Sequence, residues 1–142
     1  MVDKIYNGEE FLGLIIRNNY SADGVSFFTD DNSPQQVAFM KHQKGKEILP
    51  HVHNSIKREI FYTSEVLLIK KGRLRVDFYS ASKVYLESRV LVPGDVILLA
   101  GGGHGFQMLE EVEMIEVKQG PYLGEMDKVR FSAVESSELK LL

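Results

Sequence analysis

The stretch that decides the fold runs from residue 65 to residue 99 and reads EVLLIKKGRLRVDFYSASKVYLESRVLVPGDVILL. Short apolar runs alternate in it with turn residues, and Leu74, Val76 and Phe78 alternate with charged side chains. A period of two is typical of a strand with one buried face. The sequence Pro-Gly-Asp at 93–95 indicates a turn. The stretch therefore predicts several short strands and no helix.

The same pattern continues on both sides of this stretch. Further apolar runs lie at residues 37–40, 60–62, 106–109 and 112–118. Many short strands at a spacing of about ten residues predict a sandwich or barrel. Residues 9–16 are expected to form either a strand or one or two helical turns, and the tail 133–142 a short helix. We expect an all-β fold.

Length and composition indicate one folded domain. The chain has 142 residues, of which 44% are hydrophobic and 26% are charged, so it has the apolar content that a core needs. A chain of this length suits one compact domain. We expect a single domain over residues 1–142, with a barrel core at about 35–120.

The composition also excludes several classes of function. The absence of cysteine excludes disulfides, thiolate zinc sites and cysteine nucleophiles, so any metal must be held by nitrogen and oxygen atoms. A net charge of -3 with scattered basic residues argues against nucleic-acid binding. There is neither an apolar run of about 20 residues nor a signal-peptide pattern. We therefore expect a cytoplasmic protein without a membrane partner.

Two histidines, His51 and His53, are separated by one residue. If they lie in a strand, both imidazoles point to the same face and can share one cation. Neutral imidazole is a common ligand for zinc, iron, nickel and copper. A polar surface pair is the alternative interpretation. His42, between two polar residues, is expected to be an ordinary surface residue.

A carboxylate on a neighbouring strand would strengthen the case for a metal. Glu65 shares a strand face with Leu67 and Ile69, and if that face is the interior, the carboxylate needs a compensating partner. A metal would supply one. If Val66 and Leu68 face the core instead, Glu65 faces water.

His104 follows an apolar strand and a run of three glycines at 101–103. Glycines let the backbone pass close to a ligand or adopt a positive φ. A solvated histidine in a glycine-rich loop is the alternative.

Together these residues resemble the two motifs of the cupin superfamily. The first motif matches a glycine at 45, five residues, His51-Val52-His53, and then Glu65 followed by six residues and Gly72. Residues 94–104 resemble the second motif, which opens with Pro-Gly-Asp and ends at a histidine, here His104. The resemblance covers about half of the chain. It implies a double-stranded β-helix, or jelly-roll, barrel that holds one divalent metal ion with His51, His53, Glu65 and His104.

The chain departs from the family pattern in both motifs. Eleven residues separate His53 from Glu65, where the family has three or four. We interpret residues 54–64 as an elongated hairpin and keep Glu59 as the second choice for the carboxylate ligand. In the second motif Ala100 replaces a proline, the histidine comes one position early, and Gln107 or Met108 stands where an asparagine is usual. A specific cupin chemistry is therefore not carried over.

The implied site suggests three functions. The first is a metal-dependent enzyme, an isomerase or an oxygenase, acting on a small polar molecule such as a sugar derivative or an organic acid. Iron would suit oxygen chemistry, and manganese, nickel or zinc would suit isomerisation or Lewis-acid catalysis. The second is a non-catalytic small-molecule binder with a structural or anchoring metal. The third is metal-free sugar isomerisation with His51 as base.

Several further residues are candidates for contact with the substrate. Glu59 and Tyr122 are candidates for general acid-base catalysis. Arg58 in the expected hairpin suits an anionic substrate, although a solvated hairpin tip is the alternative. Other candidate substrate contacts are Phe61, Phe106, Met108 and Lys118, of which the apolar ones equally suit core packing. Because exposed strand edges need cover, we also expect a homodimer through the amino-terminal strands.

Overall fold

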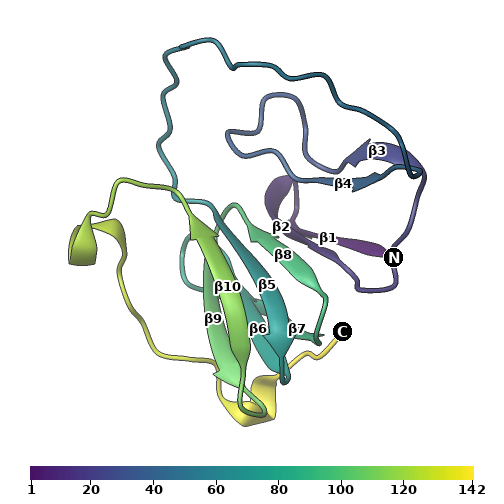
Figure 1. Cartoon of the computed structure of the whole chain (residues 1–142). Coiled ribbons are helices and arrows are strands. Elements are labelled where there is room, and N and C mark those ends of the chain that lie inside the picture. The colour runs from purple at the N-terminus through teal and green to yellow at the C-terminus, as the bar shows by residue number, and fades with distance from the viewer. The chain divides into compact units, whose positions relative to one another are not determined.

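The computed structural model describes all 142 residues, and its regular secondary structure is almost entirely β-strand (Figure 1). The strands are β1 (Val2–Asn7), β2 (Glu10–Ile16), β3 (Gly24–Phe27), β4 (Ala38–Lys41), β5 (Glu65–Lys71), β6 (Leu74–Tyr79), β7 (Tyr85–Leu91), β8 (Val96–Leu99), β9 (Gly103–Met108) and β10 (Glu113–Lys118). Two short 3-10 turns, η1 (Gly124–Asp127) and η2 (Ser136–Glu138), are the only helical elements. The expected all-β class is confirmed.

The chain forms two compact units. The first joins residues 1–20 to residues 62–142, and the second is the intervening stretch 21–61. The second unit contains the antiparallel pair β3–β4, in which Val25 lies opposite Met40. The single domain expected from the sequence stays a prediction.

The first unit contains two antiparallel sheets. One has five strands in the order β1-β2-β8-β5-β10, and the other has three in the order β7-β6-β9. Its buried apolar side chains form one cluster: Ile5, Leu12, Ile15, Leu67, Ile69, Leu74, Val76, Phe78, Leu91, Ile97 and Leu99. Because this cluster draws on both sheets, the two sheets pack on a shared core, as in a β-sandwich.

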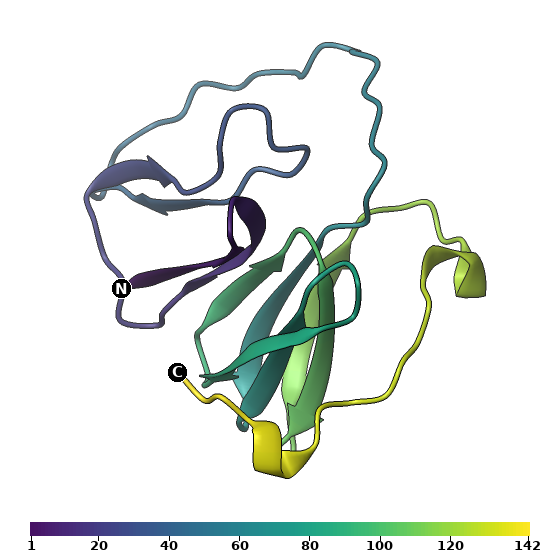
Figure 2. The ribbon, with the colours of Figure 1, turned by 180° about the vertical axis from the view of Figure 1, so that it is seen from behind.

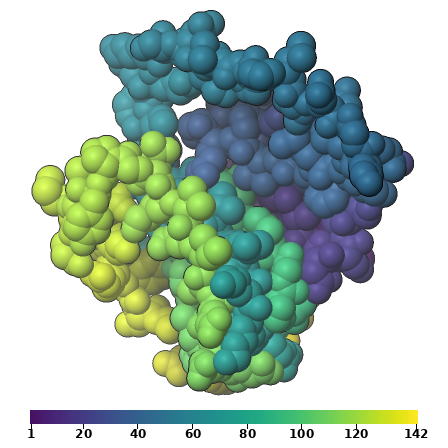
Figure 3. All heavy atoms as spheres, viewed as in Figure 1, coloured from purple at the N-terminus to yellow at the C-terminus, as the bar shows by residue number.

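The alternation along β5 decides which side chains enter this core. Leu67 and Ile69 are 2% and 1% exposed, whereas Leu68 is 37% exposed on the opposite face. That outer face also carries Ile115 and Val117 of β10, which lie directly opposite Leu68 and Val66. Figure 3 shows the teal atoms of β5 beside the green atoms of β10 on this face.

Two strands predicted from the sequence, one around His51 and His53 and one at 60–62, are absent. Residues 42–64, which include His51, His53 and the expected hairpin at 54–64, contain no strand. Every residue from 41 to 59 is exposed. The segment therefore has no buried apolar face that would stabilise strand pairing. Pro50, which lacks a backbone N–H, would also interrupt such a ladder.

The outer face of β6 was expected to face water, and it does not. Asp77 is only 3% exposed, and its carboxylate accepts hydrogen bonds from the Arg75 guanidinium and the Ser88 hydroxyl. The expected tail helix is reduced to the 3-10 turn η2. The tail is extended beyond this turn because its backbone bonds to β7: the Ser88 N–H donates to the Lys140 carbonyl, and the Leu142 N–H donates to the Ser88 carbonyl. Figure 2 shows this yellow carboxyl end beside β7.

Segment 9–16 is a strand, β2, and not a helical turn. The turn at 93–95 is also present, and Gly94 adopts the positive φ of +89° that such a turn needs. No helix in the structure has the length and apolar character required to cross a membrane.

Candidate functional site

A carboxylate and an imidazole meet at one end of the sandwich. The Oε2 atom of Glu65, the first residue of β5, lies 3.1 Å from the Nε2 atom of His104 in β9. The two strands belong to different sheets, so this pair joins the sheets across the core. Residues 65 and 104 are the two predicted metal ligands that fall in the first unit.

The strand patterns explain why both side chains point inward. Glu65 is on the same face as Leu67 and Ile69, and it is only 8% exposed. His104 lies directly opposite Phe78 of β6, which is 1% exposed, and opposed residues share a face of the sheet. Of the two orientations considered for Glu65, the structure shows the inward one, and the required partner in the structure is His104.

The glycines before His104 allow the close backbone approach expected of them. Gly102 has φ +61°, and a Cβ atom at this position would lie 2.4 Å from the Tyr79 carbonyl oxygen. A side chain is therefore excluded where the chain enters β9 against β6. This approach sets the register that places His104 opposite Phe78.

The surroundings of Glu65 favour its ionised form. A hydrogen bond with His104 is the largest cause lowering the pKa of Glu65, and the charges of His104, Lys118 and Lys128 lower it further. Burial acts in the opposite direction and is outweighed. The group is thus a carboxylate at neutral pH, which is the form that binds a cation.

This shift predicts a pH dependence of stability in the metal-free protein. Because the pKa of Glu65 is lower in the folded than in the unfolded chain, its carboxylate stabilises the fold above its ordinary pKa. The stabilisation is lost as the pH falls through the lowered, folded-state pKa. We expect Glu65→Gln to remove about 1 kcal/mol near neutral pH, because the amide oxygen can still accept from His104 but lacks the charge that strengthens the hydrogen bond. Urea unfolding of both proteins at a series of acidic pH values measures this. If the free energy of unfolding falls equally with pH in the two proteins, the lowered pKa assigned to Glu65 is wrong.

The two other predicted ligands lie in the second unit. The rings of His51 and His53 have centroids 5.2 Å apart and meet edge to face, although no strand holds them. The Nδ1 atom of His51 lies 2.9 Å from the Leu49 carbonyl oxygen. Since a carbonyl only accepts hydrogen bonds, Nδ1 carries the proton in this contact, and in the neutral ring the lone pair is then on Nε2.

The structure holds no group of three or more His, Asp or Glu side chains placed to bind a metal ion. The predicted set of four is divided between the units, with Glu65 and His104 in one and His51 and His53 in the other.

The remaining predicted site residues differ in their surroundings. Glu59, the second-choice carboxylate, forms an exposed ion pair with Lys57 at 3.3 Å. Arg58 and Phe61 are exposed in the same segment. Tyr122 is 87% exposed and makes no hydrogen bond in the structure.

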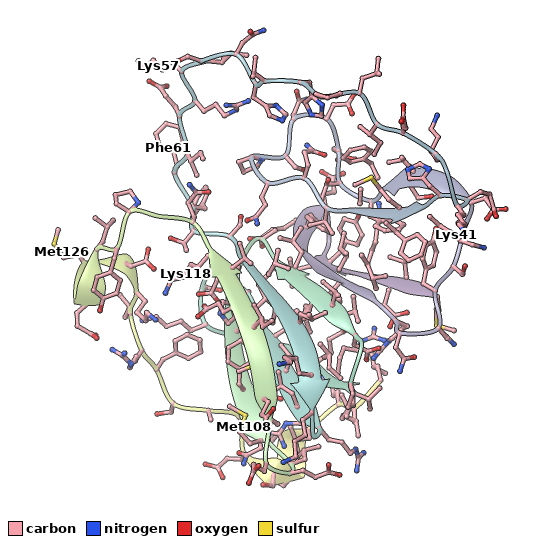
Figure 4. The ribbon with its side chains drawn as sticks, in the orientation of Figure 1. Lys41, Lys57, Phe61, Met108, Lys118 and Met126 are labelled. Atoms are coloured by element: carbon pink, nitrogen blue, oxygen red, sulfur yellow. The ribbon has the colours of Figure 1, made fainter.

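The candidate substrate contacts of the first unit lie at different distances from the Glu65–His104 pair. The Phe106 ring centroid lies 5.3 Å from that of His104. Met108 is four residues further along β9, opposite Leu74, and therefore about 13 Å beyond His104. Lys118 lies directly opposite Glu65 in the neighbouring strand. Figure 4 labels Lys118 and Met108 toward opposite ends of the sheets.

Sequence reasoning missed that the segment after β10 lies next to the start of β5. The Thr63 hydroxyl donates a hydrogen bond to the Asp127 carboxylate, which fastens η1 next to the start of β5. Lys128 directly follows, and its charge acts on Glu65. No local sequence pattern predicts that Lys128 lies near Glu65, because this proximity depends on a contact between residues far apart in the chain.

No protein-family model matches the chain, and no curated protein or solved structure matches it either.

Proposed function

We propose that the chain is a metal-binding cupin, with a double-stranded β-helix arrangement of its strands. His51, His53, Glu65 and His104 would hold one divalent ion, which is iron, manganese, nickel or zinc. The observation that carries this proposal is the inward-facing pair of Glu65 and His104, contributed by two different sheets.

The spacing of this pair fits two ligands of one ion. Nitrogen and oxygen ligands lie about 2.1 Å from such ions, so two of them at a right angle lie about 3.0 Å apart. The Glu65 and His104 atoms are 3.1 Å apart. The donor types also fit, because imidazole and carboxylate together suit the first-row transition metals.

The hydrogen bond of His51 supports its role as a ligand. Histidine ligands usually donate the second ring N–H to a carbonyl or carboxylate, which fixes the tautomer and orients the ring. His51 makes such a contact with the Leu49 carbonyl through Nδ1. Its Nε2 atom is thus the one that would bind the ion.

When bound, the ion would supply Lewis-acid or oxygen chemistry at its two remaining positions. We propose an isomerase or oxygenase acting on a small polar molecule, a sugar derivative or an organic acid. Glu65 would contribute a ligand that is ionised at neutral pH, and the Phe106 ring beside His104 would limit access of water. This proposal includes a cytoplasmic location and a homodimer, in which β1 is available because it forms an edge of the five-stranded sheet.

One observation favours a second function, a non-catalytic binder with an anchoring metal. Neither candidate acid-base residue is held in place, since Tyr122 is exposed without a hydrogen bond and Glu59 pairs with Lys57 at the surface. A panel of sugars, keto acids and diketones, incubated with the metal-loaded protein in air, separates the two. Turnover of any of them supports the enzyme, and binding without turnover supports the binder.

Metal content tests the site itself. We expect about one divalent ion per chain after reconstitution and gel filtration, measured by elemental analysis. His51→Ala and His104→Ala should each remove most of it, whereas His42→Ala should retain it. Glu65→Gln should lose metal and Glu59→Gln should keep it, because Glu59 is paired at the surface. A reconstituted parent protein without metal would overturn the proposal.

A further inference from the structure

Two lysines lie beside the Glu65–His104 pair without partners of their own. The side chains of Lys118 and Lys128 form neither a hydrogen bond nor an ion pair in the structure, although eight ion pairs are formed elsewhere. An ion pair between either lysine and the Glu65 carboxylate would be favourable, yet the structure forms none.

The strand register fixes the direction of Lys118. It lies directly opposite Glu65 and four residues from Met114, which packs against the core. Directly opposed residues have their Cβ atoms about 5 Å apart on the same face. Lys118 thus starts on the inner face, as the last residue of β10. Figure 4 labels it there, where the chain leaves toward η1 and Met126.

A second contact fixes the position of Lys128. The hydrogen bond from Thr63 holds Asp127 next to the start of β5, and Lys128 is the following residue. Its charge and that of Lys118 both act on the Glu65 carboxylate. The two lysines therefore approach the pair from different segments, one from β10 and one from the chain after η1.

The acidic groups of this region are already engaged. Glu65 is paired with His104, Asp127 accepts from Thr63, and Glu125 is paired with Arg130. None of these carboxylates forms an ion pair with Lys118 or Lys128, so both ammonium groups are available for an external anion. A divalent ion held by Glu65 and His104 would add to the positive charge there and strengthen this preference.

We infer that the ligand of this site is a small molecule bearing a carboxylate or phosphate group, which Lys118 and Lys128 bind. The inference rests on the proposed metal site and narrows its substrate class: it selects an organic acid or an acidic sugar over a neutral sugar. Lysine suits this role because its ammonium group binds an anion as a point charge and needs no fixed planar geometry.

The test uses the metal-loaded full chain and oxalate as the probe, with glucose as the neutral comparison. Isothermal titration calorimetry should show oxalate binding and no glucose binding. Lys118→Met and Lys128→Met should each weaken the Kd for oxalate about tenfold, the effect of losing one nearby charge. Methionine retains the aliphatic part of the side chain. Added salt should weaken binding to the parent more than to the double variant.

Lys70→Met is the matched control. Lys70 is an exposed lysine on β5, on the opposite face from Glu65, and its replacement should leave the Kd unchanged. Metal content is measured on every sample. If the lysine variants keep the metal and bind oxalate as the parent does, this inference is wrong and the metal site stands. If the parent binds no metal, the proposed function fails and the inference fails with it.

Discussion

Replacing Asp95 by alanine is expected to lower the free energy of unfolding by about 3–5 kcal/mol, the range for removing one partner of a buried charge network. Asp95 is completely buried. Its carboxylate accepts hydrogen bonds from the Arg17 guanidinium at 3.1 Å and from the backbone N–H groups of Asn18 at 2.8 Å and Val92 at 3.1 Å. Without it, two backbone donors and part of a guanidinium lose their acceptors.

Urea denaturation measures this loss, provided that the dependence of the unfolding free energy on urea concentration is the same in the variant and the parent. Asp95→Asn should lose less, because its amide oxygen can still accept from one backbone N–H. Asp23→Ala is the control: Asp23 forms an exposed pair with Lys41 at 2.9 Å, and its removal should cost less than about 0.5 kcal/mol. A loss below about 1 kcal/mol for Asp95→Ala would show that water replaces the carboxylate.

Asp77→Ala is expected to have a comparable effect, also about 3–5 kcal/mol. The Asp77 carboxylate accepts two hydrogen bonds from Arg75, at 2.8 and 3.0 Å, and a third from the Ser88 hydroxyl. Ser88 in turn bonds to the Tyr85 hydroxyl at 2.8 Å. Removing the carboxylate leaves a mostly buried guanidinium unpaired and frees the two hydroxyls to reorient.

The neighbouring strand offers a matched control for Asp77. Arg89 and Glu87 form the same pair two residues apart at 2.8 Å, but both side chains are about one-fifth exposed. Glu87→Ala should therefore cost at most about 1 kcal/mol. Hydrogen exchange gives a second readout, because the Lys140 N–H donates to the Tyr85 hydroxyl. Asp77→Ala should speed exchange at Lys140, and Glu87→Ala should not. Equal effects of the two substitutions would contradict the role given to burial.

The alternation of apolar residues predicted the strands around the site. The pattern at Glu65, Leu67 and Ile69 placed all three on one face, and only the structure shows that this face is inside. The separation of His51 from any strand was not predictable from local pattern, because a strand exists only where a second strand pairs with it. The amino-terminal strand β1 was expected only as part of a dimer edge, since its Asp3 and Lys4 interrupt the apolar pattern.

Burial on the outer face of β6 could not be predicted for a related reason. Arg75 and Asp77 alternate with apolar residues, as solvated side chains do on a half-buried strand. Asp77 is buried because the carboxyl-terminal tail returns to β7, more than fifty residues further along the chain. A local pattern carries no information about such a contact. The same holds for Lys128, which is brought close to Glu65 by the Thr63–Asp127 hydrogen bond.

The construction of the first unit from two separated stretches has a consequence for synthesis on the ribosome. The hairpin β1–β2 emerges first, but its partner in the sheet is β8, with Gly13 opposite Leu99. The backbone edge of β2 that pairs with β8 therefore has no partner until β8 has been translated. Strands β5 to β10 pair among themselves within one continuous stretch, so they can assemble first and receive the early hairpin last.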